Sequence, residues 1–182
     1  MDIQNSYRKI IEIMKNILEE IAARTRERIA KEKSRISVSE LENRIQEVNK
    51  NARQKITFLQ ALQKDGMSYI CEVKKASPSK GLIAPDFPYL AIAKEYEQAG
   101  ASAISCLTEP FYFQGADRYL RESAATVQIP VLRKDFTVDE YMIYQAKSLG
   151  ASAVLLICAI LDDGELRAYR QLAKGLGLDA LV

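Results

Sequence analysis

The sequence GASAISCL at residues 100–107 recurs as GASAVLLI at residues 150–157. Each copy follows a stretch whose apolar residues have the spacing of an amphipathic helix, and each ends in a short apolar run. The glycine suits the left-handed backbone that ends many helices, and an apolar run of this length suits a buried strand. The two copies therefore predict the same junction, from the end of a helix into a buried strand.

The alternation of apolar runs with amphipathic stretches continues on both sides of these junctions. The apolar runs are residues 69–73, 103–107, 131–132, 154–157 and 180–182, and the amphipathic stretches between them are residues 89–99, 117–127, 139–149 and 163–174. This order predicts parallel strands joined by helical crossovers, with four complete βα units and the start of a fifth strand. The predicted fold class is α/β.

Such units can form an open or a closed sheet. An open doubly wound sheet usually carries a glycine-rich phosphate loop after its first strand, and none follows the first apolar run here. A closed (β/α)8 barrel, the TIM barrel, needs about 250 residues, so residues 67–182 predict an incomplete barrel. A complete but smaller α/β domain stays open as the alternative.

The residues before the barrel have helical patterns. Isoleucine or methionine stands at residues 10, 14, 17 and 21, on one helix face. Ser39 and Glu42 have the spacing of a capping box at the start of a second helix. We predict a helical extension over residues 1–66 and the partial barrel over residues 67–182.

Composition excludes several classes of function. The chain has 26 Lys and Arg against 24 Asp and Glu, and a net charge of +2 gives no case for nucleic acid as a partner. Six basic and two acidic residues over 24–35 form either a solvated helix face or a patch for an anionic surface. The longest apolar stretch, residues 151–161, is shorter than the roughly 20 residues of a membrane span, and we expect no signal peptide.

The chain has no histidine, and its three cysteines, Cys71, Cys106 and Cys158, stand apart inside apolar runs. Unpaired cysteines of this kind are typical of reduced thiols in a cytoplasmic protein. Without histidine, catalysis by Ser-His or Cys-His pairs and a zinc site are not expected. Any catalysis must use carboxylates, lysines or a metal held by oxygen.

The first strand carries charges in an apolar context. Period-two alternation places Ile70, Glu72 and Lys74 on one face and Cys71 and Val73 on the other. A carboxylate on a barrel strand is costly to bury unless it is paired. Glu72 and Lys74 therefore form either an acid/base pair near the rim of the barrel or a structural ion pair.

Three further segments lie at the carboxyl ends of predicted strands, where barrel enzymes have their active sites. Lys134 and Phe136 alternate to one face, and Lys134 is either a general acid, an anion partner or the partner of Asp135 in a surface pair. The loop KASPSKG, residues 75–81, offers hydroxyls and backbone groups to an anion. The aromatic residues of TEPFYFQG, residues 108–115, either stack on a planar substrate or cover the core.

These stretches together closely resemble one family. The segments ICEVKKASPSKG (70–81), LTE with YFQG (107–109 and 112–115), PVLRKDF (130–136) and LLI (155–157) are similar, in residues and in spacing, to indole-3-glycerol-phosphate synthases. The resemblance implies a (β/α)8 barrel and a cytoplasmic carboxy-lyase of tryptophan biosynthesis. Its reaction would close the ring of 1-(2-carboxyphenylamino)-1-deoxyribulose 5-phosphate, with loss of carbon dioxide and water, to give indole-3-glycerol phosphate.

The resemblance also implies roles for single residues. Lys134 matches the general acid, Glu72 matches a catalytic glutamate that assists proton transfer, and Lys74 matches a lysine that pairs with it and reaches the anionic groups of the substrate. The substrate-binding residues that it implies are Ser77, Phe113, Phe136 and Leu155. The implied partner is a phosphorylated small molecule, and no cofactor, metal, nucleic acid or membrane is expected.

In the family, the fifth strand carries a second catalytic glutamate directly after the stretch that corresponds to Leu181-Val182, and later strands carry the phosphate site. Residues 1–182 are therefore expected to hold half of an active site, to be inactive alone, and to self-associate through open sheet edges. A catalytically dead fragment or assembly module is one alternative. The sister barrel, phosphoribosylanthranilate isomerase, is another, although it uses a Cys/Asp pair and lacks the helical extension.

Overall fold

The computed structural model describes residues 3–51 and 56–182, and the side chains of residues 17–50 and 56–182. The helices are α1 (Ile3–Lys33), α2 (Val38–Asn51), α3 (Phe58–Leu62), α4 (Tyr89–Gln98), α5 (Asp117–Thr126), α6 (Glu140–Ser148) and α7 (Asp163–Gly175). The strands are β1 (Ile70–Val73), β2 (Ala76–Ser77), β3 (Gly81–Leu82), β4 (Ala103–Leu107), β5 (Val131–Lys134), β6 (Ala153–Leu155) and β7 (Asp179–Leu181). Every strand and helix predicted after residue 67 is present.

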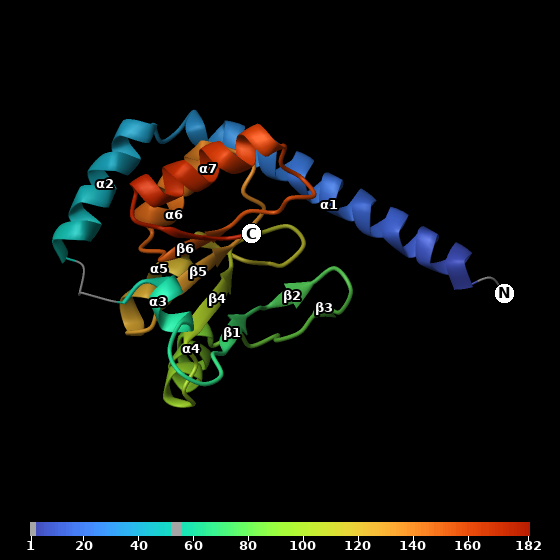
Figure 1. Cartoon of the computed structure of the whole chain (residues 1–182). Coiled ribbons are helices and arrows are strands. Elements are labelled where there is room, and N and C mark those ends of the chain that lie inside the picture. The colour runs from blue at the N-terminus through green and yellow to red at the C-terminus, as the bar shows by residue number, and fades with distance from the viewer. Residues whose placement is uncertain (1–2, 52–55) are drawn as a thin grey trace.

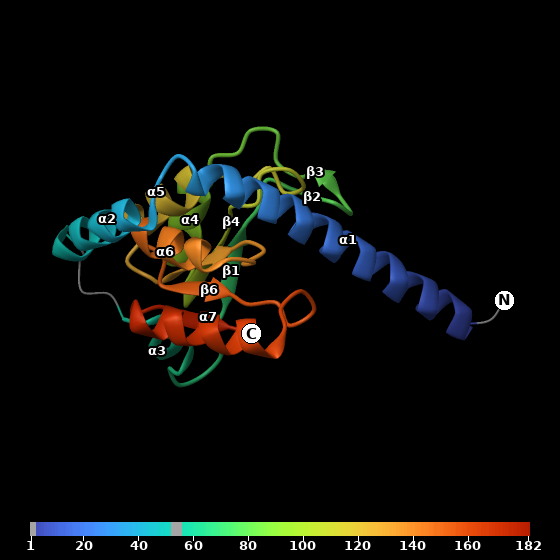
Figure 2. The same cartoon turned by 90° about the horizontal axis from the view of Figure 1, so that it is seen from above.

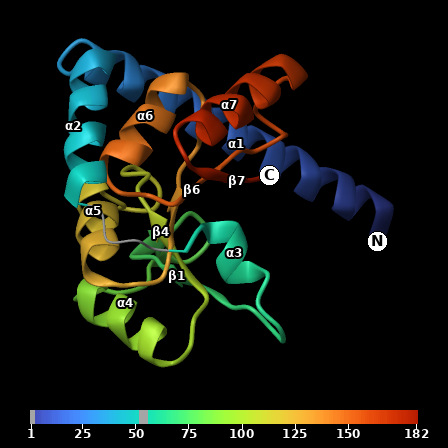
Figure 3. The ribbon, with the colours of Figure 1, turned by 60° about the vertical axis from the view of Figure 1, so that its left-hand side comes forward.

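The main sheet is parallel, and its strands lie side by side in chain order, β1-β4-β5-β6-β7. Helices α4 to α7 follow one another around the outside of this curved sheet (Figures 1 and 3). A doubly wound sheet reverses its strand order at a switch point, and this order does not reverse. The predicted architecture, four βα units of a (β/α)8 barrel and a fifth strand, is confirmed.

The pleat of the strands separates two apolar layers. Side chains on the outer face pack against the helices and form the main core, and they include Val73, Ile104, Cys106, Val131, Val154 and Leu156. Side chains on the inner face form a second, smaller cluster, made of Ala103, Leu132 and Ala153 around Phe58. Alternation along each strand therefore decides which residues face the interior of the barrel.

The repeated GASA segments form the same junction twice. Gly100 and Gly150 have φ angles of +92° and +84°, in the left-handed region that favours glycine. After each glycine the chain enters its strand through the same bond, because the Ser102 amide donates to the Tyr69 carbonyl and the Ser152 amide donates to the Val131 carbonyl, both at 2.8 Å. The predicted helix-to-strand junctions are confirmed.

The helical extension packs on the barrel units rather than standing apart. Ala22 and Ile29 of α1 and Leu41 of α2 share a cluster with Tyr141 and Met142 of α6. The first part of α1 extends away from the sheet and the other helices (Figures 1 and 2). The side chains of residues 10 and 14 lie outside the described ones, and a domain division at residue 66 stays a prediction.

The start of α2 differs from the sequence prediction. Ser39 lies inside the helix, and Ser37 caps it by accepting a hydrogen bond from the Glu40 amide at 3.1 Å. The sequence offers the pattern Ser-x-x-Glu twice, from Ser37 and from Ser39, and spacing alone does not choose between them. No helix in the described part of the chain is long and apolar enough to cross a membrane.

The short helix α3 and the β2–β3 hairpin were not predicted. Thr57 and Gln60 form a capping box that starts α3, and the Leu59 amide donates to Asp179 of β7 at 2.8 Å. These bonds hold Phe58 against the first residues of β4 and β6, Ala103 and Ala153. Phe58 therefore fills the amino end of the barrel interior, beside two alanines that leave room for its ring.

Phe58→Ala should leave a cavity at this end of the barrel, because the neighbouring side chains of Ala103 and Ala153 are too small to fill the space of the buried ring. We expect the free energy of unfolding to fall by about 3–5 kcal/mol, measured by urea denaturation followed by circular dichroism. Leu59→Ala is the matched control, since Leu59 is half exposed on the same helix, and its effect should stay near about 0.5 kcal/mol. Equal losses in the two variants would contradict the role of Phe58.

Candidate active site

Glu72 of β1, Lys74 directly after β1 and Lys134 of β5 meet on the inner face of the sheet. Glu72 lies opposite Ser105 in the β1–β4 pair, and Lys134 lies opposite Leu107 in the β4–β5 pair. Val73, which follows Glu72 in β1, belongs to the outer core. Glu72 therefore lies on the opposite, inner face of the sheet. The carboxyl ends of parallel strands meet at one end of the barrel, so the register brings residues 62 positions apart together.

The contacts confirm that Glu72 is the centre of this cluster. Lys74 Nζ lies 2.6 Å from Glu72 Oε1, and Lys134 Nζ lies 3.2 Å from Oε2. The Ser105 hydroxyl donates to Oε2 at 3.3 Å. The predicted meeting of Glu72, Lys74 and Lys134 is therefore present, and Ser105 is a fourth member that was not predicted.

The electrostatics of the cluster keep the carboxylate ionised. Burial alone would raise the pKa of Glu72, but hydrogen bonds and charges from Lys74 and Lys134 leave its pKa below the ordinary value. The three side chains remain 28–35% exposed, so a molecule from solvent can reach them. The arrangement offers two ammonium donors and one carboxylate acceptor, which suits proton transfer and anion binding. Among the described residues, no group of His, Cys, Asp or Glu side chains could hold a metal ion.

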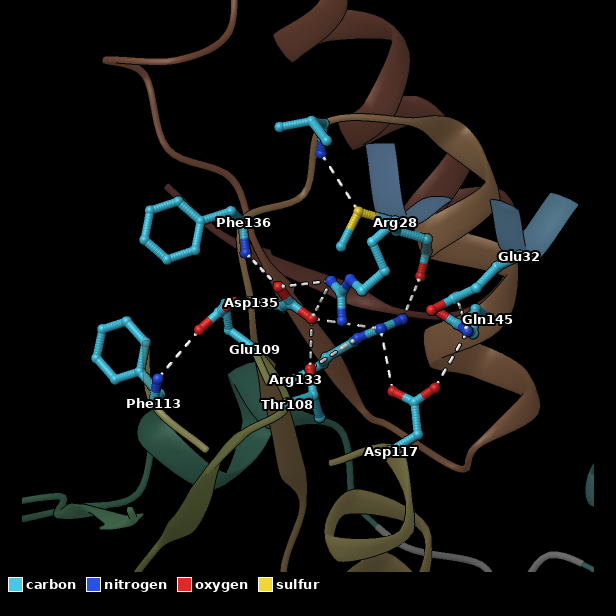
Figure 4. A network of polar contacts seen from close by, with 12 residues as sticks. Arg28, Glu32, Thr108, Glu109, Phe113, Asp117, Arg133, Asp135, Phe136 and Gln145 are labelled. Carbon is cyan, nitrogen blue, oxygen red and sulfur yellow. Dashed lines mark hydrogen bonds and ion pairs between the residues drawn. The ribbon is translucent and has the colours of Figure 1, made fainter. Parts of the chain in front are cut away.

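Two aromatic residues, Phe113 and Phe136, lie in the loops that follow β4 and β5. The centroids of Phe113 and Phe136 are 6.3 Å apart, and Figure 4 shows both rings on the same side of a network of charged residues. The structure thus brings together the two aromatic residues that the sequence singled out.

Glu109 shapes the loop that carries Phe113. Its side chain is fully buried and accepts hydrogen bonds from the amides of Phe111, Tyr112 and Phe113 at 2.9, 2.7 and 3.0 Å. Three amide donors on one carboxylate fix the backbone of the loop. The Glu109 carboxylate therefore binds the backbone of the loop, a structural role that could not be predicted from the sequence.

Ser77 and Leu155 lie in different surroundings. Ser77 is in β2, where its hydroxyl accepts a hydrogen bond from the Lys80 amide at 3.2 Å and helps to close the β2–β3 hairpin. Leu155 is half-buried in β6, on the same face as Ala153, and pairs with Leu181 of β7. Their roles in substrate binding stay predictions.

The alternative of a surface pair between Lys134 and Asp135 is wrong. Asp135 is fully buried and contacts Arg28 of α1, Arg133 of β5 and Thr108 (Figure 4). Since neighbouring residues of a strand point to opposite faces, Lys134 faces the interior while Arg133 and Asp135 do not. The basic run at residues 24–35 is also more than a solvated face, because the Arg28 side chain is largely buried in an ion pair with Asp135.

Comparison with known proteins identifies the family of this chain. The family model described as "Indole-3-glycerol phosphate synthase" matches residues 18–182. The chain belongs to this family. The resemblance noted in the sequence is thereby confirmed, and the matched region includes all the residues of the cluster.

Relatives of the same name are found in several bacteria. The synthase of Lacticaseibacillus paracasei is 53% identical over 166 residues, and that of Ruminiclostridium cellulolyticum is 52% identical over 167 residues. The synthase of Thermoanaerobacter pseudethanolicus is 46% identical over 166 residues. Each alignment covers 91% of this chain, but the chain spans only 62–63% of the length of these relatives.

The two lysines should set the ionisation of Glu72. Lys74→Met or Lys134→Met removes one ammonium group while burial remains, so the pKa of Glu72 should rise in either variant, and Lys80→Met in the exposed hairpin should leave it unchanged. The measurement is the pH titration of the Glu72 carboxyl carbon by NMR. Because the folded-state pKa is lowered, this carboxylate stabilises the fold at neutral pH, and that stability is lost as the pH falls below about 4.5. An unchanged titration in both lysine variants would contradict the cluster.

Proposed function

We propose that this chain supplies the first half of the active site of an indole-3-glycerol-phosphate synthase. The substrate is 1-(2-carboxyphenylamino)-1-deoxyribulose 5-phosphate, and the product is indole-3-glycerol phosphate. The observation that supports this proposal most directly is the cluster of Glu72, Lys74 and Lys134 at the carboxyl end of the inner sheet face. Family membership supports a decarboxylating ring closure over another chemistry of the same cluster.

Lys134 is the proton donor of the ring closure. The ring carbon that bears the carboxylate bonds to the carbonyl carbon of the ribulose chain, and Lys134 protonates the carbonyl oxygen as it becomes a hydroxyl. The carbon–carboxylate bond then breaks, carbon dioxide leaves, and the bonding electrons return to the ring and its iminium nitrogen. Lys134 lies 3.2 Å from Glu72 and can recover a proton from it once Glu72 has accepted one from carbon in the later step.

Glu72 is the base of the later step. The ionised Glu72 removes a proton from carbon, and the hydroxyl leaves as water with a proton from an ammonium group beside Glu72, which restores the aromatic indole. Lys74 stays beside Glu72 and attracts the anionic groups of the substrate. Phe113 and Phe136 line the anthranilate ring, Leu155 adds an apolar contact, and Ser77 lies in the segment that binds the chain of the substrate.

The proposal extends to the setting of the protein. Cys71, Cys106 and Cys158 are free thiols, which supports a cytoplasmic enzyme. Within the described residues, β1 and β7 are the outermost strands of the sheet, and each pairs with a neighbouring strand on one side. Ile70, Leu181 and Val182 are exposed at these edges. Open edges with apolar side chains favour association, either with further strands of a synthase or with a second copy of this chain.

Replacement of the proton donor tests the chemistry. In a synthase assembled with residues 1–182, Lys134→Met should lower kcat by roughly 100- to 10,000-fold, because the stem is kept and the donor is lost. Product formation is followed by indole fluorescence. Lys94→Met on the exposed face of α4 is the control and should keep full turnover. Wild-type kcat in Lys134→Met would remove Lys134 from the mechanism.

Complementation tests the division of the site. Residues 1–182 alone should form no product and should associate in light scattering, since the sheet edges are open. Addition of the remaining carboxyl-terminal segment of the Lacticaseibacillus paracasei synthase should restore turnover and reduce self-association, because the two chains are 53% identical over the part they share. A monomer of residues 1–182 that turns over substrate unaided would overturn the proposed division.

A further inference from the structure

A buried carboxylate lies directly next to Lys134 in the chain. Asp135 accepts hydrogen bonds from Arg28 at 2.9 and 3.1 Å, from the Thr108 hydroxyl at 2.7 Å and from the Phe136 amide at 2.8 Å. Its side chain has no exposed surface. Asp135 thereby joins α1, the end of β4 and the end of β5 at one point behind the candidate active site (Figure 4).

Arg28 is the strongest partner of this carboxylate. One terminal nitrogen of Arg28 reaches both oxygens of Asp135, although the two residues are 107 positions apart. Arg133 is the second cation, but it lies 3.4 Å from Asp135 and also binds Thr108, the Met142 carbonyl and Asp117. Burial alone would raise the pKa of Asp135, and the charges of Arg28 and Arg133 hold it below the ordinary value.

The hydrogen bonds of Asp135 hold the backbone that directly follows the Lys134 side chain. Toward the carboxyl end, Asp135 holds the amide of Phe136. Toward β4, Asp135 holds the Thr108 side chain, and the Thr108 amide donates to the Lys134 carbonyl at 3.1 Å. A shift of Asp135 would therefore move the strand end that carries Lys134.

We propose that Arg28 is a positioning residue for the active site, which acts through Asp135 to hold the strand end that carries Lys134 and Phe136. The inference rests on the proposed function, since it takes Lys134 as the proton donor. It assigns to α1 a part in catalysis, although Arg28 does not touch the reacting groups. Helix α1 is therefore an outer layer of the fold that also supports the candidate active site through Arg28 and Asp135.

A second set of contacts joins α1 to the loop after β4. Residues Glu20, Arg24 and Arg28 recur every four positions and lie on one face of α1. Glu20 accepts a hydrogen bond from the Tyr112 hydroxyl at 2.5 Å, and the Arg24 guanidinium lies 5.5 Å from the centre of the Tyr112 ring. This face of α1 therefore contacts the loops after β4 and β5, which carry Phe113 and Phe136 respectively.

Loss of the Arg28 charge should loosen this end of the site. A buried carboxylate without its main cation takes up a proton or turns toward water, and in either case it holds the Phe136 amide and Thr108 less well. A displacement of a catalytic group by about 1 Å can cost roughly 100-fold in rate. We expect a loss of kcat of that order, with a smaller effect on KM because the donor rather than the binding surface is displaced.

The test compares Arg28→Met with Arg28→Lys and with Arg26→Met, a control on the exposed side of α1. In residues 1–182, Arg28→Met should speed hydrogen exchange at the Thr108 and Phe136 amides roughly tenfold or more, while exchange in α4 stays unchanged. The pKa of Glu72 should rise in the same variant, since its contact with Lys134 weakens. Arg28→Lys should restore part of both signals, and Arg26→Met should change neither.

Kinetics in the complemented synthase give the functional half of the test, with rates corrected for the folded fraction. A fall of kcat by about 100-fold in Arg28→Met and partial recovery in Arg28→Lys support the proposal. Faster exchange throughout the chain, with the Glu72 titration unchanged, would overturn it and leave Arg28 a general stabilising residue. If Arg28→Met does not fold, the same measurements on Arg28→Lys decide. Absence of turnover with unmodified Arg28 would count against the proposed function, while exchange and titration would still decide the role of Arg28.

Discussion

Four consecutive residues, Arg133 to Phe136, point alternately to the two sides of the sheet, and the site depends on this pleat. Lys134 and Phe136 face the interior, where they meet Glu72 and Phe113. Arg133 and Asp135 face α1 and the helices, where they are buried in ion pairs. A shift of one residue in the register of β5 would exchange the two sets and destroy both the site and its support.

The two charged clusters differ in what surrounds them. In the outer one, Arg133 and Asp135 are closed to solvent, and the Asp135 carboxylate is held by guanidinium groups, a hydroxyl and a backbone amide. Such a group is costly to disturb, because any lost partner leaves a buried charge. The inner cluster is part-exposed and is held by two lysines, whose ammonium groups can exchange protons and partners. One face of β5 is therefore held by buried ion pairs, while the charges on the other face stay accessible from solvent.

Much of this arrangement could be predicted from sequence, for reasons that individual residues make clear. Glu72 and Lys134 stand in short strands, where period-two alternation fixes the face and the parallel order fixes the neighbour, and Lys74 follows directly after the first of these strands. The contact between Arg28 and Asp135 could not be predicted, since it joins residues 107 apart through a helix whose docking angle no local pattern sets. The same holds for Phe58, which reaches the barrel interior from a helix of five residues.

A carboxylate near an active site is not thereby a candidate for catalysis. Glu72, Glu109 and Asp135 all follow or end strands of the barrel, and the sequence alone makes each a possible acid or base. The structure separates them by what their oxygens already bind. Glu109 and Asp135 are buried and accept hydrogen bonds from backbone amides. Protonation or displacement of either carboxylate would remove the hydrogen bonds that hold the adjoining loop. Glu72 binds part-exposed side chains instead, so of these three carboxylates it is the one whose oxygens can turn toward a molecule from solvent.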